Sequence, residues 1–289
     1  MSVLLSQGTS LFSRARRGIG NAAKIVKRTD NCVPVLIQIL HAEINPDHAT
    51  GQDITFKTRN GAKITSPLQG RSWWPIFEVV ADDCYHIADL IRDLNALETD
   101  SPIIVDIGGH VGTFTVHIAS QIPTARVTVF EPSSYFLSYL TLNLRQNDLN
   151  GRTNVENLAV TGIPGPVRLL NDRVMPTVSL LTEGDEPAEK DQIVQSTSLN
   201  EIINRIGGHI DLLKMDCEGS EYTILANASR DTLLALNAVI LEFHSAPRPA
   251  MEEFFDHLAE SGLQEQWRSE SGGVGTSGGV GTSYWVRRK

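Results

Sequence analysis

Short apolar runs alternate with amphipathic stretches over residues 103–262, which is typical of a sheet covered by helices. In the intervening helices, apolar residues recur every three or four positions. This alternation predicts a parallel sheet with helices on both faces. The strands are predicted at Ile103–Ile107, Arg126–Phe130, Val155–Val160, Ile210–Met215 and Val239–Phe243. Four helices are predicted between and after them: one with Phe114 and Ile118, one with Leu137 and Leu140, one with Leu199 and Ile202, and one over Met251–Leu258. A Ser198–Glu201 capping box precedes the third helix.

The preceding residues form a separate N-terminal layer in this interpretation. Ile54–Lys57 and Ala62–Thr65 alternate around Asn60-Gly61, which is a strong hairpin signal. A helix-like stretch, Tyr85–Leu97, then leads to a break at Asp100-Ser101-Pro102. We therefore predict an extension over residues 1–100 and a second domain over residues 101–289.

The end of the chain repeats the hexapeptide GGVGTS, at Gly272–Ser277 and Gly278–Ser283. Two short copies are too few for a solenoid. No helix start or P-loop lysine follows them, so a phosphate-binding loop is disfavoured. We predict a flexible loop that joins Gln264–Trp267 to Ser283–Val286 in an antiparallel sheet edge.

Composition supports an ordinary globular enzyme or binding protein. Of 289 residues, 41% are hydrophobic and 20% charged, and the net charge is −9. The longest apolar run, Val33–Leu40, is interrupted by Gln38 and is far shorter than a membrane span. Three separated cysteines argue against a disulfide framework or structural zinc. No signal-peptide pattern is present, so we expect a cytoplasmic protein.

Charge is unevenly distributed along the chain. Residues 1–30 carry six basic side chains and one acid, Asp30, whereas the remainder carries 19 basic and 33 acidic side chains. We expect this basic start to form a solvated helix that packs on its own acidic domain; contact with an anionic partner or a membrane surface is the alternative. Nucleic acid is not expected as a substrate, because the acidic remainder repels phosphates.

A glycine-rich turn follows the first predicted strand, in the order D-x-G-G-x-x-G over residues 106–112. Such a turn before a helix is typical of a nucleotide-cofactor loop. Asp106 opposes a pyrophosphate at the helix start and favours a cationic, phosphate-free ligand such as S-adenosylmethionine. Glu131 ends the next strand, 19 residues after Gly112, where an acid can accept hydrogen bonds from ribose hydroxyls.

The sequence resembles the FkbM family of class I S-adenosylmethionine-dependent methyltransferases. The resemblance covers roughly residues 77–245 and implies a Rossmann-like seven-stranded sheet, parallel except for an antiparallel last strand. It also implies O-methylation of small molecules or sugars. The motifs that carry it are FEVVADDCY (77–85), VDIGGHVGTFT (105–115), VFEPSS (129–134), LNLRQNDLN (142–150), NLAVTG (157–162), LLKMDCEGSEYTIL (212–225) and LEFH (241–244).

By this resemblance, Asp106 contacts the methionine part of the cofactor, Glu131 holds the ribose, and Asn157, Leu158 and Ala159 lie beside adenine. The full set of expected cofactor-binding residues is Asp106, Gly108, Gly109, His110, Gly112, Thr113, Phe114, Glu131, Pro132, Ser133, Asn157, Leu158, Ala159 and Asp216.

Catalytic candidates follow the fourth and fifth strands, because reacting groups collect at the carboxyl ends of parallel strands. We predict that His244, neutral near pH 7, takes the acceptor proton and that Asp216 positions the acceptor or the cofactor. Glu218 is a third candidate, and a solvated helix start is the alternative for Glu218 and Glu221. We expect Lys214 to form an ion pair, Cys217 to have a packing role, and His110 to cap the loop or to be catalytic. Asp216, Glu242 and His244 could together bind a divalent metal, which we leave unassigned.

The predicted function is transfer of a methyl group from S-adenosylmethionine to a hydroxyl of a small molecule, such as a sugar or a natural-product scaffold. The alternative is a non-catalytic binding or scaffolding protein with the same fold. Asp106 opposes a third possibility, an NAD or nucleotide-sugar enzyme. The sequence leaves a homodimer open.

Overall fold

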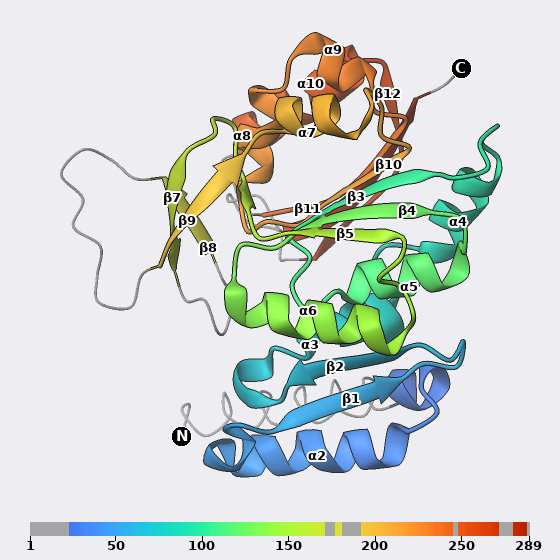
Figure 1. The fold of residues 1–289 in the computed structure, drawn as a ribbon, viewed down its shortest axis with the longest axis vertical. Coiled ribbons are helices and arrows are strands. Elements are labelled where there is room, and N and C mark those ends of the chain that lie inside the picture. Colours follow the sequence, from blue (N-terminus) through green and yellow to red (C-terminus); the bar gives the residue numbers. More distant parts are fainter. Residues whose placement is uncertain (1–22, 171–176, 181–191, 245–247, 272–279, 288–289) are drawn as a thin grey trace, which may run out of the picture. The chain divides into compact units, whose positions relative to one another are not determined.

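A computed structural model describes residues 23–170, 177–180, 192–244, 248–271 and 280–287 (Figure 1). The chain divides into two compact units, Met1–Cys84 and Tyr85–Lys289. Helix α4 (Ile87–Asn95) falls in the second unit, whereas the sequence-based proposal placed it in the extension. The functional boundary at residue 100 stays a prediction. In the described residues, no helix has the length and apolar character needed to cross a membrane.

The first unit is built around the predicted hairpin. Strands β1 (Asp53–Lys57) and β2 (Lys63–Pro67) pair antiparallel, with Phe56 opposite Ile64, and both of these side chains are buried. The other elements are α2 (Cys32–Ile44), the 3₁₀ helices η1 (Pro46–Ala49) and η2 (Gln69–Arg71), α3 (Trp74–Ile76) and the π-helix η3 (Phe77–Asp82).

Two side chains of the basic start pair with acids of this unit. Lys24 forms an ion pair with Asp82, and the Arg28 guanidinium lies 3.9 Å from Asp83. Both acids belong to the first unit, so the expectation that the basic start packs on the acidic second domain stays a prediction. Ile25, between Lys24 and Arg28, is buried, so residues 23–30 are an integral part of the first unit.

The second unit contains a seven-stranded sheet in the order β12-β13-β11-β10-β3-β4-β5. Strand β13 is antiparallel to both of its neighbours, β12 and β11, and the four pairs from β11 through β5 are parallel. The expected fold is therefore confirmed. The strands are β3 (Ile103–Ile107), β4 (Arg126–Phe130), β5 (Thr153–Glu156), β10 (Leu212–Met215), β11 (Ala238–Phe243), β12 (Leu263–Ser271) and β13 (Val280–Arg287).

Helices cover both faces of this sheet (Figure 1). Helices α5 (Thr113–Gln121) and α6 (Ser134–Gln146) lie on one face, and α7 (Leu199–Ile206), α9 (Arg230–Leu234) and α10 (Arg248–Glu260) lie on the other. Helix α8 (Glu221–Ala226) follows β10. A large apolar core packs the second group of helices onto the strands, with Leu213 and Val239 from the sheet against Ile202 and Phe254.

One predicted strand is wrong. Residues 155–160 are divided between β5 and β6 (Ala159–Val160), and these two strands belong to different sheets. The break is at Asn157, whose side-chain amide donates hydrogen bonds to the carbonyls of Glu131 and Pro132. A second sheet, which the sequence interpretation missed, has the order β6-β9-β7-β8 and adds β7 (Pro166–Leu170), β8 (Thr177–Leu180) and β9 (Gln192–Thr197).

The C-terminal hairpin has the predicted antiparallel pairing, β12 with β13. Its loop is shorter than expected, because Val280–Ser283 of the second GGVGTS copy belongs to β13. There, Thr282 lies opposite Glu242 and Gly281 opposite Phe243. The first copy, at residues 272–277, lies outside the described residues.

Candidate functional site

The glycine-rich turn connects the end of β3 to the start of α5. The backbone N–H groups of Gly108 and Gly109 both donate to the carbonyl of Phe130, at 3.0 Å. Gly108 has φ +80°, and a Cβ there would lie 1.8 Å from the carbonyl oxygen of Asp216. The residue at position 108 must therefore be glycine because the chain leaving β10 passes against it, a reason independent of any ligand.

Asp106 lies under this turn and is fully buried. The ammonium of Lys214 is 3.1 Å from one carboxylate oxygen, and the Thr115 hydroxyl donates to the other at 2.6 Å. The ion pair expected for Lys214 is therefore confirmed. It corrects the argument that the charge of Asp106 favours a cationic ligand. Asp106 is not an uncompensated charge awaiting a cationic ligand, since Lys214 already balances it.

Lys214 serves more than one partner. It donates to the Gly108 carbonyl at 2.9 Å and lies 3.7 Å from Asp216. Burial alone would lower the pKa of its ammonium, but the charges of Asp106 and Asp216 raise that pKa above its usual value. Lys214 is therefore a permanent cation that joins the turn to the end of β10.

Glu131, which directly follows β4, is the residue expected to hold the ribose of the cofactor. Its carboxylate is buried, and its two oxygens accept backbone N–H groups from Ser133 at 2.8 Å and His110 at 2.7 Å. Each oxygen retains lone-pair capacity for a further donor. Burial raises the pKa of Glu131 to about 7, although the two hydrogen bonds act in the opposite direction.

Beyond the glycine pair, His110 Nδ1 in the turn and Thr113 Oγ1 at the start of α5 are buried and have no hydrogen-bond partner among the described residues. The His110 ring packs on Phe136 at a centroid distance of 3.9 Å. Burial lowers the pKa of His110 to about 3, so its imidazole is neutral at pH 7 and a poor proton acceptor. Unpaired buried polar atoms are costly unless a ligand satisfies them.

The other expected cofactor residues have clear structural roles. Ser133 is buried and caps α6 by accepting the N–H of Phe136. Phe114 packs edge-on against Tyr85, with a centroid distance of 5.6 Å. The remaining residues of the expected set have these surroundings: Gly109 lies against Val129, Gly112 against Leu140, and Leu158 against the apolar core. The Pro132 carbonyl accepts a hydrogen bond from the Asn157 amide, and Ala159 belongs to β6.

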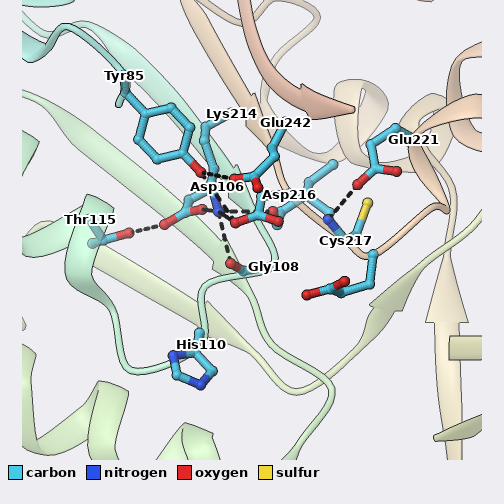
Figure 2. A network of polar contacts seen from close by, with 12 residues as sticks. Tyr85, Asp106, Gly108, His110, Thr115, Lys214, Asp216, Cys217, Glu221 and Glu242 are labelled. Carbon is cyan, nitrogen blue, oxygen red and sulfur yellow. Dashed lines mark hydrogen bonds and ion pairs between the residues drawn. The ribbon is translucent and has the colours of Figure 1, made fainter. Parts of the chain in front are cut away.

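A second polar group lies where β10 and β11 end (Figure 2). The hydroxyl of Tyr85 donates to Asp216 at 3.2 Å and lies 3.4 Å from Glu242. The single hydroxyl proton of Tyr85 is thus shared between the carboxylates of Asp216 and Glu242. The sequence interpretation gave Tyr85 no role, because it precedes Asp216 by 131 residues; its place at the end of the FEVVADDCY motif was the available signal.

His244 lies between two carboxylates. Its Nε2 is 3.3 Å from Glu218 and its Nδ1 is 3.3 Å from Glu221. Although burial acts the other way, these carboxylates and Asp216 raise the pKa of His244 to about 9. The expectation that His244 is neutral near pH 7 is therefore wrong for the protein without ligands, because its imidazole is held as a cation.

Glu221 is fully buried, which overturns its solvated alternative. It accepts the N–H group of Cys217 at 2.7 Å (Figure 2). It also accepts the N–H group of Gly219 at 2.8 Å and thereby closes the turn between β10 and α8. Glu218 is partly exposed, and burial raises the pKa of its carboxyl. The Cys217 thiol also has a raised pKa, again through burial, and is no nucleophile.

Three side chains of this group have the spacing of metal ligands. One ligand atom from each of Asp216, Glu218 and His244 lies within 4.8 Å of the others. Glu218 thus takes the place that the sequence interpretation gave to Glu242 in a possible metal set.

Residues 106–263 match the Methyltransferase FkbM domain. The chain is 25% identical to Methyltransferase 1 of Beauveria bassiana over 186 residues, which cover 57% of this chain and 70% of that protein. It is 21% identical to the AMB antimetabolite synthetase AmbE of Pseudomonas aeruginosa over 267 residues. That match covers 78% of this chain but only 12% of AmbE, so the chain spans a small part of this relative.

Two solved structures share 12% sequence identity with the chain. TrmK of M. capricolum, in complex with S-adenosylhomocysteine, has a TM-score of 0.41 over 71% of this chain and 69% of its own. TYW2 of M. jannaschii, in complex with AdoMet, has a TM-score of 0.42 over 82% and 87%, respectively.

Proposed function

We propose a specific reaction for this chain, which belongs to the FkbM methyltransferase family and is an S-adenosylmethionine-dependent methyltransferase. In this proposal, it methylates a hydroxyl oxygen of a small molecule. The observation that carries the proposal is the group of Tyr85, Asp216 and Glu242 at the strand ends, beside the glycine turn. Carboxylates in that place suit an acceptor that must lose a proton as it gains the methyl group.

The residues around the turn fit the methyl donor. Glu131 has two buried carboxylate oxygens for the ribose hydroxyls, and the unpaired His110 Nδ1 and Thr113 Oγ1 are available to the same ligand. When bound, S-adenosylmethionine supplies an electrophilic methyl group on a sulfonium. We assign Asp106 and Lys214 to holding the turn in position, because they are paired with each other beneath it.

We assign the acceptor proton to the carboxylates of Asp216 and Glu242. The acceptor O–H bond breaks as the O–CH₃ bond forms and the S–CH₃ bond breaks, and one of these carboxylates takes the proton and passes it to water. Tyr85 orients both groups through its single hydroxyl proton. Lys214, 3.7 Å from Asp216, forms an ion pair with that carboxylate.

The charge of the site restricts the acceptor. Four carboxylates, from Asp216, Glu218, Glu221 and Glu242, outnumber the two cations beside them, Lys214 and His244, so a phosphorylated or carboxylated acceptor meets electrostatic repulsion. Neutral polyols, sugars and cationic natural-product scaffolds are favoured. Similarity to part of a protein named as an antimetabolite synthetase supports a natural-product acceptor for this chain.

The test is a methyl-transfer screen with ¹³C-methyl-labelled donor against neutral, cationic and phosphorylated hydroxyl compounds. We expect a neutral or cationic acceptor to gain one methyl, and the carbon chemical shift to assign it to oxygen. Asp216→Asn should reduce turnover about 10²–10⁴-fold, as loss of a proton acceptor does, with donor affinity nearly unchanged. Methylation of nitrogen or carbon, or donor binding without turnover on any acceptor, would contradict the proposal.

A further inference from the structure

We infer that Asp216, Glu218 and His244 form a binding site for one divalent transition-metal cation, which positions the acceptor oxygen. The role of the cation in orienting an acceptor rests on the proposed function. The binding of the cation does not, and it is measurable without any methyl acceptor.

The spacing of the three side chains supports a shared ion. Ligand atoms bound to one metal at about 2.0–2.2 Å lie about 3–3.5 Å apart when they are adjacent in its coordination shell. His244 Nε2 and the Glu218 carboxylate are 3.3 Å apart, and all three ligand atoms lie within 4.8 Å. The three side chains are between 18% and 31% exposed, so an ion can reach them from solvent.

The surrounding residues already orient these ligands as in a metal site. The other ring nitrogen of His244, Nδ1, faces the buried Glu221 carboxylate at 3.3 Å. A carboxylate behind the second nitrogen is the usual partner of a metal-bound histidine, since it fixes the ring and its tautomer. Glu221 is itself held by two backbone N–H groups, and Asp216 by Tyr85.

The local charge also calls for a cation. Four carboxylates, from Asp216, Glu218, Glu221 and Glu242, gather around the ends of β10 and β11. The permanent cation among them, Lys214, lies closer to Asp106, at 3.1 Å, than to Asp216, at 3.7 Å. The His244 imidazolium balances one of these charges. A divalent ion bound in place of its proton carries one more positive charge and so neutralises more of the four carboxylates.

The ligand types indicate which cation. Two carboxylates and one imidazole suit a first-row transition ion such as Mn²⁺, Fe²⁺ or Zn²⁺ better than Ca²⁺, which prefers oxygen ligands only. Three protein ligands leave coordination positions open for an acceptor hydroxyl. With Asp216 on the ion, Glu242 remains as the carboxylate that takes the proton.

The experiment is a titration of the metal-free full chain with Mn²⁺, followed by the electron paramagnetic resonance signal of free Mn²⁺. We expect one site per chain, with affinity reduced about tenfold or more in Glu218→Gln and in His244→Gln. The matched control is His86→Gln, which changes an exposed histidine 3.9 Å from Asp89. His86 belongs to no group of three possible ligands within the described part of the chain, so this variant should bind Mn²⁺ as the wild type does. A folded wild-type chain that binds no Mn²⁺, or ligand variants that bind it unchanged, would overturn the inference.

A second measurement needs no variant and covers a failure of either one to fold. Substoichiometric Mn²⁺ should broaden the imidazole NMR signals of His244 while those of His86 stay sharp. Broadening of other histidines without broadening of His244 would overturn the site. The outcome also separates the two hypotheses. If Mn²⁺ binds at His244 but no hydroxyl is methylated, the metal site is supported and the proposed function is contradicted. If the chain methylates a hydroxyl but binds no Mn²⁺, the proposed function is supported and the metal site is contradicted.

Discussion

At the scale of single residues, Lys214 is a buried ammonium between the carboxylates of Asp106 and Asp216. Lys214→Met removes the positive charge and leaves the fully buried Asp106 without its ionic partner. We expect a loss of about 3–5 kcal/mol in the free energy of unfolding, which is typical when one member of a buried ion pair is removed. Chemical denaturation of the wild type and the variant measures it.

The double variant Asp106→Asn with Lys214→Met is the control for this prediction. Removal of both charges leaves no unpaired buried ion, so the double variant should be more stable than Lys214→Met alone. If the single and double variants unfold at the same denaturant concentration, the pair does not stabilise the turn.

Glu131 gives the site a dependence on pH. Burial raises the pKa of its carboxyl to about 7. A protonated carboxyl accepts hydrogen bonds from the ribose hydroxyls less well than a carboxylate does. Donor affinity should therefore be highest above pH 7 and fall by up to about tenfold per pH unit as the pH drops below 7. Calorimetric titration with S-adenosylhomocysteine between pH 5 and 8.5 measures it.

Glu131→Gln separates this effect from other titrations. The variant lacks the carboxylate but keeps nearly the same side-chain volume, so its affinity should be lower at pH 8 and its pH dependence much flatter. A Glu131→Gln profile parallel to that of the wild type would assign the pH dependence to another group.

At the scale of elements, the contact between the turn after β3 and the end of β10 depends on Gly108. A methyl group there would lie 1.8 Å from the Asp216 carbonyl oxygen, and the backbone is in the left-handed region. Gly108→Ala should displace the two segments and reduce donor affinity at least tenfold, by strain of about 1–3 kcal/mol. Gly151→Ala is the control, because no atom lies within 4 Å of its added Cβ.

Calorimetry with S-adenosylhomocysteine compares these two variants, and circular dichroism checks that each is folded. Equal affinities for Gly108→Ala and the wild type would show that the loop tolerates the added methyl group. That result would contradict the role assigned to this contact.

At the scale of the whole molecule, two truncations probe the start of the chain. Residues 1–22 precede the family match at 106–263, so their removal should leave donor affinity nearly unchanged. Removal of residues 1–30 also deletes the buried Ile25 and the partners of Asp82 and Asp83. We expect the longer truncation to destabilise the first unit by about 2–5 kcal/mol, by analogy with large core truncations.

Thermal unfolding followed by circular dichroism distinguishes the two truncations. If both unfold with the midpoint of the full chain, the packing of residues 23–30 contributes nothing to stability. If the shorter truncation already loses the donor, the start of the chain belongs to the binding machinery rather than to an extension.

Over the whole molecule, the sequence by itself determined the elements whose signals are local. The hairpin at Asn60-Gly61, the strands β3 and β4, the helix cap at Ser198 and the glycine turn all follow from residues a few positions apart. The antiparallel pairing of β12 and β13 was also predictable, because a hairpin joins neighbours in the chain. Together with the ordered motifs, these signals were sufficient for the family and the fold.

Only the tertiary structure decided how the charged groups pair, because the partners are distant in sequence. Tyr85 meets Asp216 across 131 residues, and Asp106 meets Lys214 through the pairing of β3 with β10. Burial and neighbouring carboxylates, which no local pattern encodes, place the pKa of His244 near 9 instead of near neutrality. The short strands of the second sheet were missed for the same reason, since each is stabilised by a partner elsewhere in the chain.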